Sequence, residues 1–489
     1  MELGAQRLSI EDVVRVAREA EPVSIGAMAR SKMALGRKRL EELLARGERI
    51  YGVNTGIGGN VGISLGPDQM ELLQHNLMRE LGCATGQPLP PDAVRAAMLL
   101  RIATFLSGAS AVRPELVDAL AELLNRGVTP VVPRYGSVGA SGDLMPSAYI
   151  ARVLLGMGEA EFQGRRMPSA EALAAAGLQQ MRFASKEGLA LINGTTVMTG
   201  AAALVWVDAS LALRALLGAV ALSIEAMKAP DLPFAAWVHE MKGHPGQIAV
   251  ASYLREMLEG SSYTRASSGQ PCYSLRCAPQ GLGQVWEGLE DSRAPLEREI
   301  NSANDNPLIH PDTGALYKAG NFYGGHIARL LDTWKIDFAS MANWGNALMA
   351  LLVDDRFSDG LPANLTPKPG VNSGFKGMQL SITSLACAVR QMAGPSSIHS
   401  LPTEQYNQDV VSLGMHAAVT AMDALECVRN LTAMLLMAAA QAVDLRGGPE
   451  RLGRGSRRVY DAVRRVIDFE NRDRAKEREV AELAGNLPG

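Results

Sequence analysis

The segment Tyr135–Tyr149, YGSVGASGDLMPSAY, has very few bulky side chains just before an apolar helix is expected to begin. Between Gly136 and Leu144, three glycines and three other small residues fill six of nine positions. An ordinary turn needs one or two such residues, because glycine is required only where the backbone is left-handed or another group approaches closely. The segment therefore predicts a site where the backbone itself is needed.

The tripeptide Ala140-Ser141-Gly142 carries the groups for a reaction within the backbone. Attack of the Gly142 amide nitrogen on the Ala140 carbonyl carbon would close a five-membered ring, and loss of two waters, one from Ser141, would leave an exocyclic methylidene. Glycine lets the nitrogen approach closely, alanine does not block the turn, and a rigid scaffold would supply the strain. The product is an electrophile that none of the twenty side chains provides. A simple glycine turn at a helix start is the competing interpretation.

The composition favours helices over sheets. Hydrophobic residues make up 47% of the 489 residues and aromatic residues only 5%, and Ala, Leu and Met are good helix formers. Three segments, at 197–227, 323–355 and 410–443, are too long and too apolar to be surface helices. We predict a mainly all-α fold, with an N-terminal domain at residues 1–190 that carries the glycine-rich segment. A long-helix bundle at residues 191–489 would follow it and mediate oligomerisation.

Shorter helices are marked by their ends. Ser9 and Asp12 have the spacing of a capping box. Pro114 and Gly127 stand where a helix is expected to open and close. The charged segment at 469–485 predicts a solvated helix.

Several classes of function lack their signals in this sequence. The net charge of -3, the pI of about 6.2 and the lack of a basic stripe argue against a nucleic-acid partner. GIGGNVG has Val61 in place of the third glycine of a dinucleotide loop, and GASGD has Asp143 in place of the last glycine of a nucleophile elbow. The seven histidines and five cysteines show no metal-ligand spacing, so neither a metal nor a dissociable cofactor is expected. Scattered thiols, an N-terminus without an apolar signal core and an apolar stretch at 188–207 broken by polar residues predict a cytoplasmic protein without a membrane span.

The segment GSVGASGDL resembles the signature of the histidine, phenylalanine and tyrosine ammonia-lyase family, whose members build a methylidene-imidazolone (MIO) from Ala-Ser-Gly. Other blocks resemble the family's blocks in the same order: YGVNTGIG, KEGLALINGTT, YSLRCAPQ, EINSANDNPL, AGNFYGG and NQDVVSLG. The resemblance implies that the enzyme eliminates ammonia from the α-carbon and a proton from the β-carbon of an aromatic amino acid. It also implies an MIO formed from Ala140, Ser141 and Gly142, and a homotetramer with shared active sites.

Site residues follow from the resemblance position by position. Tyr51 matches the base, and a phenol with a pKa of about 10 acts near neutrality only if that pKa is lowered, so a helix end or an arginine is expected beside it. Arg276 matches the residue that pairs with the substrate carboxylate, and Asn193 the amide that supports the ring and the carboxylate. Further matches are a second active-site tyrosine and three pocket residues: Tyr273, Gln270, Asn321 and Phe322. Asp143 either assists cyclisation or caps the helix expected to begin there.

The substrate is indicated by differences from the histidine-specific members. They carry Ser-His where this chain has Glu80-Leu81, and Glu where it has Gln408, and both differences argue against histidine. Leu81 and Gln408 resemble the phenylalanine and tyrosine branch, in which position 80 faces the far end of the ring. A buried carboxylate needs a donor, so Glu80 favours tyrosine, or a cationic ring, over phenylalanine. The alternative is that Glu80 meets Arg79, another cation or solvent and never the substrate.

Two other functions stay open. A 2,3-aminomutase uses the same chemistry but returns the amine to the β-carbon, and the glycines after Tyr51 favour a mobile lid and hence product release by a lyase. A non-catalytic helical scaffold would have no reason to keep the tripeptide, Tyr51 and Arg276 together.

Overall fold

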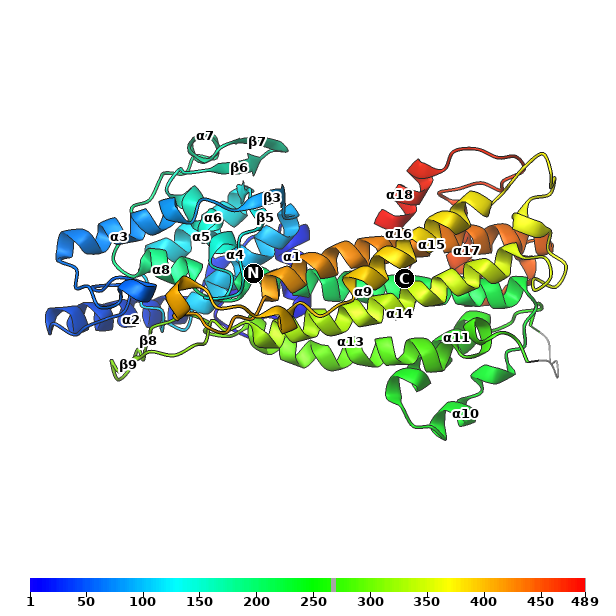
Figure 1. The fold of residues 1–489 in the computed structure, drawn as a ribbon, viewed down its shortest axis with the longest axis horizontal. Coiled ribbons are helices and arrows are strands. Elements are labelled where there is room, and N and C mark those ends of the chain that lie inside the picture. The colour runs from blue at the N-terminus through cyan, green and yellow to red at the C-terminus, as the bar shows by residue number, and fades with distance from the viewer. Residues whose placement is uncertain (265–269, 489) are drawn as a thin grey trace. The chain divides into compact units, whose positions relative to one another are not determined.

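The structure is a computed structural model that describes residues 1–264 and 270–488 (Figure 1). Helices dominate the described chain, and its strands are at most four residues long. The predicted mainly all-α class is therefore confirmed.

The described chain forms two compact units, each assembled from three stretches of sequence. The first unit comprises Met1–Leu204, Arg293–Leu331 and Pro395–Val419, and the second comprises Val205–Ser292, Asp332–Gly394 and Thr420–Gly489. The chain changes unit within α9 (Thr196–Ala226), α13 (Ala278–Ile300), α14 (Gly325–Val353) and α16 (Gly414–Arg446). The domain boundary near residue 190 stays a prediction. The compact units divide the chain differently because each of these long helices contributes residues to both.

The first unit holds the shorter elements. Its helices are α1 (Ile10–Arg18), α2 (Ala27–Ala45), α3 (Pro67–Glu80), α4 (Pro91–Phe105), α5 (Pro114–Arg126), α6 (Met145–Leu154), α7 (Ser169–Ala175) and α8 (Glu187–Ile192), with 3-10 turns η1 (Gly58–Asn60), η4 (Ser397–His399) and η5 (Glu404–Tyr406). Its strands are β1 (Glu2–Leu3), β2 (Ser24–Ile25), β3 (Thr85–Pro88), β4 (Thr129–Pro130), β5 (Pro133–Tyr135), β6 (Glu159–Phe162), β7 (Arg165–Pro168), β8 (Leu308–Ile309) and β9 (Leu316–Tyr317). β1 pairs in parallel with β2, and the antiparallel pairs are β3–β5, β4–β6, β6–β7 and β8–β9.

Helix ends in the first unit follow the sequence signals. Ser9 and Asp12 form the predicted capping box at the start of α1, and α5 runs from Pro114 to a left-handed Gly127. The buried Arg95 of α4 donates hydrogen bonds to the carbonyls of Val16, Ala17 and Leu124, at the ends of α1 and α5. A buried arginine thus satisfies the carbonyls that a helix end leaves without a partner.

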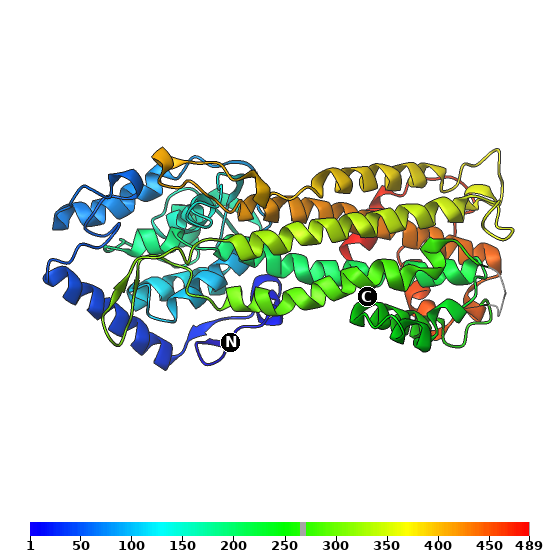
Figure 2. The same ribbon diagram turned by 60° about the horizontal axis from the view of Figure 1, so that its bottom comes forward.

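The second unit is built around long helices. Its other elements are η2 (Leu232–Phe234), α10 (Ala236–Glu240), α11 (Pro245–Leu258), α12 (Tyr273–Arg276), η3 (Ala363–Leu365), α15 (Lys376–Met392), η6 (Pro449–Arg451), α17 (Arg454–Arg464) and α18 (Glu477–Gly485). Within this unit α9, α13, α14, α15 and α16 run side by side (Figures 1 and 2). Trp206 of α9 donates to the Leu289 carbonyl of α13 at 2.7 Å, and Trp334 of α14 donates to Ser292 of α13 at 3.3 Å. The three apolar segments singled out in the sequence are therefore bundle helices, as predicted.

Helix α9 is the described helix that is long and apolar enough to cross a membrane. However, 72% of its most apolar window is buried inside the structure. This burial is typical of a core helix.

The charged C-terminal segment differs from its prediction. Only Glu477–Gly485 is helical, and Val480 and Leu483 of this helix are buried. The preceding Glu470 is buried too, because its backbone exchanges two hydrogen bonds with the side chain of Gln441. The prediction of one solvated helix was wrong, since a charge pattern does not reveal such pairing.

Candidate active site

The glycine-rich segment lies in the first unit between β5 and α6, pressed against other parts of the same unit. Gly142 has a φ of +73°, and a Cβ added to it would overlap the Gly194 carbonyl and lie 2.9 Å from the carbonyl oxygen of Phe322. Hydrogen bonds fix this approach: Gly194 N–H donates to the Ser141 carbonyl at 3.0 Å, and Asp143 N–H donates to the Gly194 carbonyl at 2.6 Å. Position 142 therefore admits no side chain.

This geometry fits the MIO that the tripeptide is expected to form. Ala140 and Gly142 are buried and Ser141 is half-buried, so the reacting backbone is largely shielded from water. Gly139, with a φ of +81°, is packed so closely against Ser412 and Leu413 that a Cβ there would lie 2.7 Å from the Leu413 nitrogen. Close packing on both sides of Ala140 and Ser141 is the rigid support that ring closure requires.

Asp143 caps a helix, but a different one from the helix expected. It is fully buried, and its carboxylate accepts hydrogen bonds from the Val197 and Met198 backbone at 2.5 and 3.0 Å, which places it at the start of α9 and not of α6. Burial raises the pKa of Asp143 to about 7, although the two N–H donors and Arg101 oppose the rise. The capping prediction thus failed in the identity of the helix, because Leu144 and not Asp143 stands at the N-cap position of α6.

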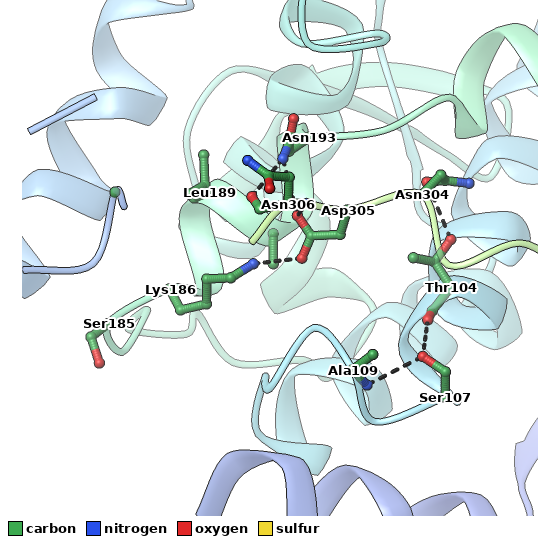
Figure 3. Close-up of polar contacts among 12 residues, drawn as sticks. Thr104, Ser107, Ala109, Ser185, Lys186, Leu189, Asn193, Asn304, Asp305 and Asn306 are labelled. Atoms are coloured by element: carbon green, nitrogen blue, oxygen red, sulfur yellow. Dashed lines mark hydrogen bonds and ion pairs between the residues drawn. The ribbon is translucent and has the colours of Figure 1, made fainter. Parts of the chain in front are cut away.

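Asn193 ends α8 next to the tripeptide, since its neighbour Gly194 is the residue that contacts Ser141 and Gly142. The buried Arg101 donates to the Asn193 carbonyl at 2.9 Å and to the Ala190 carbonyl at 3.2 Å. The Asn193 side chain is 3% exposed, and its amide nitrogen donates to Asp305 and to the Asn306 carbonyl (Figure 3). Backbone and side chain of Asn193 are thus both held.

Tyr51 lies in a turn before η1, where the Gly58 N–H donates to its hydroxyl at 2.9 Å. Burial raises the pKa of Tyr51, the Gly58 hydrogen bond opposes this, and the Glu404 carboxylate adds to the rise. A helix end does lie beside Tyr51, since Gly58 is the first residue of η1 and its N–H lowers this pKa, but burial and Glu404 outweigh it in the single chain. The sequence could not show that Glu404, which comes from η5, lies beside the Tyr51 turn.

The residues expected to determine substrate specificity lie at two places in the first unit. Leu81 is buried at the end of α3, whereas Glu80 is exposed. Arg79 donates to Asn76 at 3.0 Å. Gln408 is half-buried and accepts from the Thr403 hydroxyl at 3.0 Å. Within one chain the Glu80 side chain is therefore exposed to solvent. Its need for a hydrogen-bond donor was inferred on the premise that the carboxylate is buried, and the single chain does not meet that premise.

Two further pocket candidates lie in the stretch just before α14. The Phe322 carbonyl faces Gly142, and the Phe322 side chain is half-buried. Asn321 is exposed and donates to the Ala303 carbonyl at 3.2 Å. The structure thus brings Phe322, by its backbone, to the tripeptide.

Gln270, Tyr273 and Arg276 belong to the second unit. The Arg276 guanidinium carbon lies 4.6 Å from the centre of the Tyr273 ring, so both side chains share one face of α12, as their spacing predicts. Arg276 also donates to the Pro271 carbonyl at 3.0 Å and, with Gln270 and Cys277, lines a cavity of about 330 Å³. Tyr273 is 70% exposed. The tyrosine and the arginine are therefore paired and available on the surface of this unit.

Sequence reasoning missed three buried charges beside Asn193, namely Arg101, Lys186 and Asp305. Arg101 and Lys186 stand in or next to apolar runs, LLRIATF and KEGLALI, whereas Asp305 stands between two asparagines. A charge inside an apolar run is costly unless it is paired, so that signal could have found Arg101 and Lys186 but not Asp305. Within residues 1–264 and 270–488, no group of three or more His, Cys, Asp or Glu residues is placed to hold a metal ion.

Comparisons with known proteins agree with this geometry. A family model described as aromatic amino acid lyase matches residues 8–465. The chain is 38% identical to a histidine ammonia-lyase from Streptococcus gordonii, over 96% of this chain and 91% of that protein. Its structure resembles the phenylalanine aminomutase of Pantoea agglomerans, with a TM-score of 0.95 at 33% identity over 100% of this chain and 98% of that one. It also resembles the tyrosine aminomutase from Streptomyces globisporus, with a TM-score of 0.95 at 34% identity over 100% and 96% of the two chains.

Proposed function

The chain belongs to the aromatic amino acid lyase family and is a carbon–nitrogen lyase, and on that premise we propose that it eliminates ammonia from an aromatic L-amino acid to give an aryl acrylate. Tyrosine, which would give p-coumarate, is the substrate that we place first. Phenylalanine follows, and histidine is less favoured. The non-catalytic scaffold is set aside, since the family's members are enzymes.

The observation that carries this proposal is the packing of Gly142 against the backbone of Gly194 and Phe322. It leaves room for no side chain at the residue whose nitrogen would close the ring. An MIO formed from Ala140, Ser141 and Gly142 would supply an electrophile toward the substrate amine. The support for its formation is the fit of these three residues to that chemistry.

The chain's own residues would carry the proton and hold the substrate. We assign to Tyr51 the removal of the β-proton, although burial and Glu404 raise its pKa in the isolated chain. Cationic groups that approach Tyr51 on assembly or on substrate binding would lower that pKa. Arg276 would bind the carboxylate through a planar, bidentate contact, and Asn193 would hold the ring and the carboxylate. Gln270, Tyr273, Asn321 and Phe322 would complete the pocket.

The choice of tyrosine depends on Glu80, Leu81 and Gln408. A carboxylate at the far end of the ring would accept a hydrogen bond from a phenol and would be left without a partner by phenylalanine. Glu80 is exposed in the single chain, so it would be desolvated only when a subunit or the substrate covers it. Histidine ranks lower on the residues at 80, 81 and 408, although relatives such as the Streptococcus gordonii enzyme are named for histidine.

We further propose a cytoplasmic homotetramer with active sites shared between subunits, without nucleic-acid or membrane partners. The exposed Tyr273 and the open cavity beside Arg276 support shared sites, because both residues are available to another copy of the chain. The long apolar helices support oligomerisation.

A 2,3-aminomutase is the second candidate, and the similarity to phenylalanine and tyrosine aminomutases over nearly the whole chain favours it. One assay separates the candidates. The purified protein is incubated with L-tyrosine, L-phenylalanine and L-histidine in turn, and ammonia and near-ultraviolet absorbance are followed together. A lyase raises both, fastest with tyrosine. An aminomutase gives a β-amino acid, seen by NMR, with little ammonia. Turnover of L-histidine alone would refute the tyrosine assignment.

A further inference from the structure

A buried charge pair adjoins the side chain of Asn193 (Figure 3). The Lys186 ammonium is 2.5 Å from Asp305 Oδ2, and both side chains are completely buried. Burial lowers the pKa of Lys186, and Asp305 opposes this. Neither residue belongs to the substrate-binding or proton-transfer groups assigned above.

Asp305 joins the two ends of the short helix α8. Lys186 stands just before this helix, with a φ of +79°, and Asn193 follows its last residue. Asp305 binds Lys186 through Oδ2 and accepts from Asn193 Nδ2 at 3.2 Å through Oδ1. The helix that presents Asn193 is therefore tied at both ends to one carboxylate.

The same contacts decide which end of the Asn193 amide is left free. The second acceptor for Asn193 Nδ2 is the Asn306 carbonyl, at 2.7 Å. An amide NH₂ has two hydrogens, so Asp305 and Asn306 use both of them. An ionised carboxylate accepts hydrogen bonds and cannot donate, so it holds the nitrogen toward itself and leaves Asn193 Oδ1 as the free end.

A buried ion pair is a poor way to add stability. Desolvation of two charges offsets most of their attraction, and well-packed apolar residues often do as well or better. Orientation of a neighbouring amide, in contrast, is something that an acceptor-only group provides and an apolar group does not. Three donors converge on Asp305, since the Asn306 N–H also donates to Oδ1, at 2.6 Å.

We propose that Lys186 and Asp305 are positioning residues that fix the Asn193 amide with its oxygen toward the reacting centre. This inference rests on the proposed function and refines the role of Asn193 in it. The free amide oxygen accepts hydrogen bonds, so it would face the N–H groups of the substrate amine and not the carboxylate, which is an acceptor too. Lys186 holds the carboxylate in place, and the carboxylate sets the direction of the amide.

Asp305→Asn tests the direction of the amide. The Lys186 ammonium would hold the oxygen of the new amide, so the NH₂ of residue 305 would face Asn193 Nδ2. Two donors cannot bond each other, and Asn193 would turn over. We expect kcat to fall about 10²-fold, the usual effect of a catalytic group displaced by a small distance. In Lys186→Met/Asp305→Asn no cation holds that oxygen, so residue 305 can offer it to Asn193, and kcat should recover at least about tenfold relative to Asp305→Asn.

Glu187→Gln is the matched control. Glu187 adjoins Lys186, is fully buried and pairs with Arg113 at 2.7 Å. Its carboxylate accepts hydrogen bonds from Arg113 and from the Ala184 N–H, and not from Asn193. This variant should lose stability, measured as Tm, much as Asp305→Asn does, with kcat changed less than about threefold. In an Asn193→Ala background, Asp305→Asn should have no further effect on kcat, because the residue through which it acts is gone.

The outcomes separate a positioning role from a structural one. Intact mass gives the fraction of chains with the closed ring, and kcat is expressed per closed ring. Three results would each overturn the proposal. The first is an equal loss of kcat in Asp305→Asn and Glu187→Gln, and the second is no recovery of kcat in Lys186→Met/Asp305→Asn. The third is an undiminished effect of Asp305→Asn on kcat in the Asn193→Ala background. If neither Asp305→Asn nor Lys186→Met/Asp305→Asn folds, the pair serves folding, and the proposal is overturned too.

A crystal structure of Asp305→Asn supplies a readout that does not depend on turnover. The donors and acceptors around residue 193 show whether its amide has turned over. If the wild type releases no ammonia from any aromatic amino acid, the proposed function fails. A turned amide would then still support the positioning role, and an unturned one would refute it.

Discussion

Gly142→Ala tests most sharply whether the glycine-rich segment needs a residue without a side chain at position 142. A Cβ at this position would overlap the Gly194 carbonyl and lie 2.9 Å from the Phe322 oxygen, where ordinary contact begins at 3.4 Å. Both obstacles are backbone, which cannot rotate away as a side chain can. The φ of +73° adds a cost of its own, about 1–2 kcal/mol for a residue with a Cβ.

The total effect follows from these two contributions. Forcing an extra methyl into a packed site costs about 1–3 kcal/mol, so we expect the free energy of unfolding to fall by about 2–5 kcal/mol when the cost of the left-handed backbone is included. We also expect the ring not to close, because the displaced nitrogen of residue 142 no longer meets the Ala140 carbonyl. The purified variant should therefore have the full mass of its sequence and no lyase activity.

Gly127→Ala is the control for the backbone contribution. Gly127 has nearly the same φ, +72°, but nothing lies within 4 Å of the position of an added Cβ. This variant should lose only about 1–2 kcal/mol and keep both the ring and the activity. A Gly142→Ala chain two water molecules lighter than its sequence would refute the steric explanation. So would a stability loss equal to that of Gly127→Ala.

Three further predictions follow from other parts of the molecule. Glu80→Gln should lower kcat/KM for L-tyrosine by at least about tenfold, the value of a hydrogen bond to a charged group, without lowering that for L-phenylalanine; equal effects on both would show that Glu80 does not read the phenol. The pKa of Asp143 is about 7 when folded and about 3.9 when unfolded, so the folded chain binds the extra proton between these values, and stability should fall as pH rises from about 4 to 7, by at most about 1.4 kcal/mol per pH unit. Urea titrations at several pH values should show a smaller fall in Asp143→Asn than in the wild type; a fall remains because burial also raises the pKa of Asp337 to about 7. Ser9→Ala removes the capping box of α1 and should cost about 1 kcal/mol in the same titrations, whereas Ser31→Ala, at an exposed site in α2, should cost almost nothing.

The features that were predictable from sequence are those set by neighbours along the chain. Helix α9 was expected at 197–227 and is found at Thr196–Ala226, because a long apolar run can be satisfied only by burial. Gly127 closes α5 since glycine tolerates the left-handed conformation found there. The face that Tyr273 shares with Arg276 follows from their three-residue spacing.

What the sequence could not show depends on contacts between distant segments. Asp143 caps a helix that begins more than fifty residues later, so local spacing suggested the wrong one. Glu404 faces the Tyr51 turn and helps to raise its pKa, although the two residues are far apart in sequence. Lys186 and Asp305 are likewise brought together only by the fold.

The central claim is that Ala140, Ser141 and Gly142 close into an electrophilic ring, and the mass of the intact, denatured wild-type chain tests it most directly. We predict a chain two water molecules lighter than its sequence. Ser141→Ala, which lacks the hydroxyl lost in the second step, should not lose both. A wild-type chain with the full mass of its sequence would contradict the account.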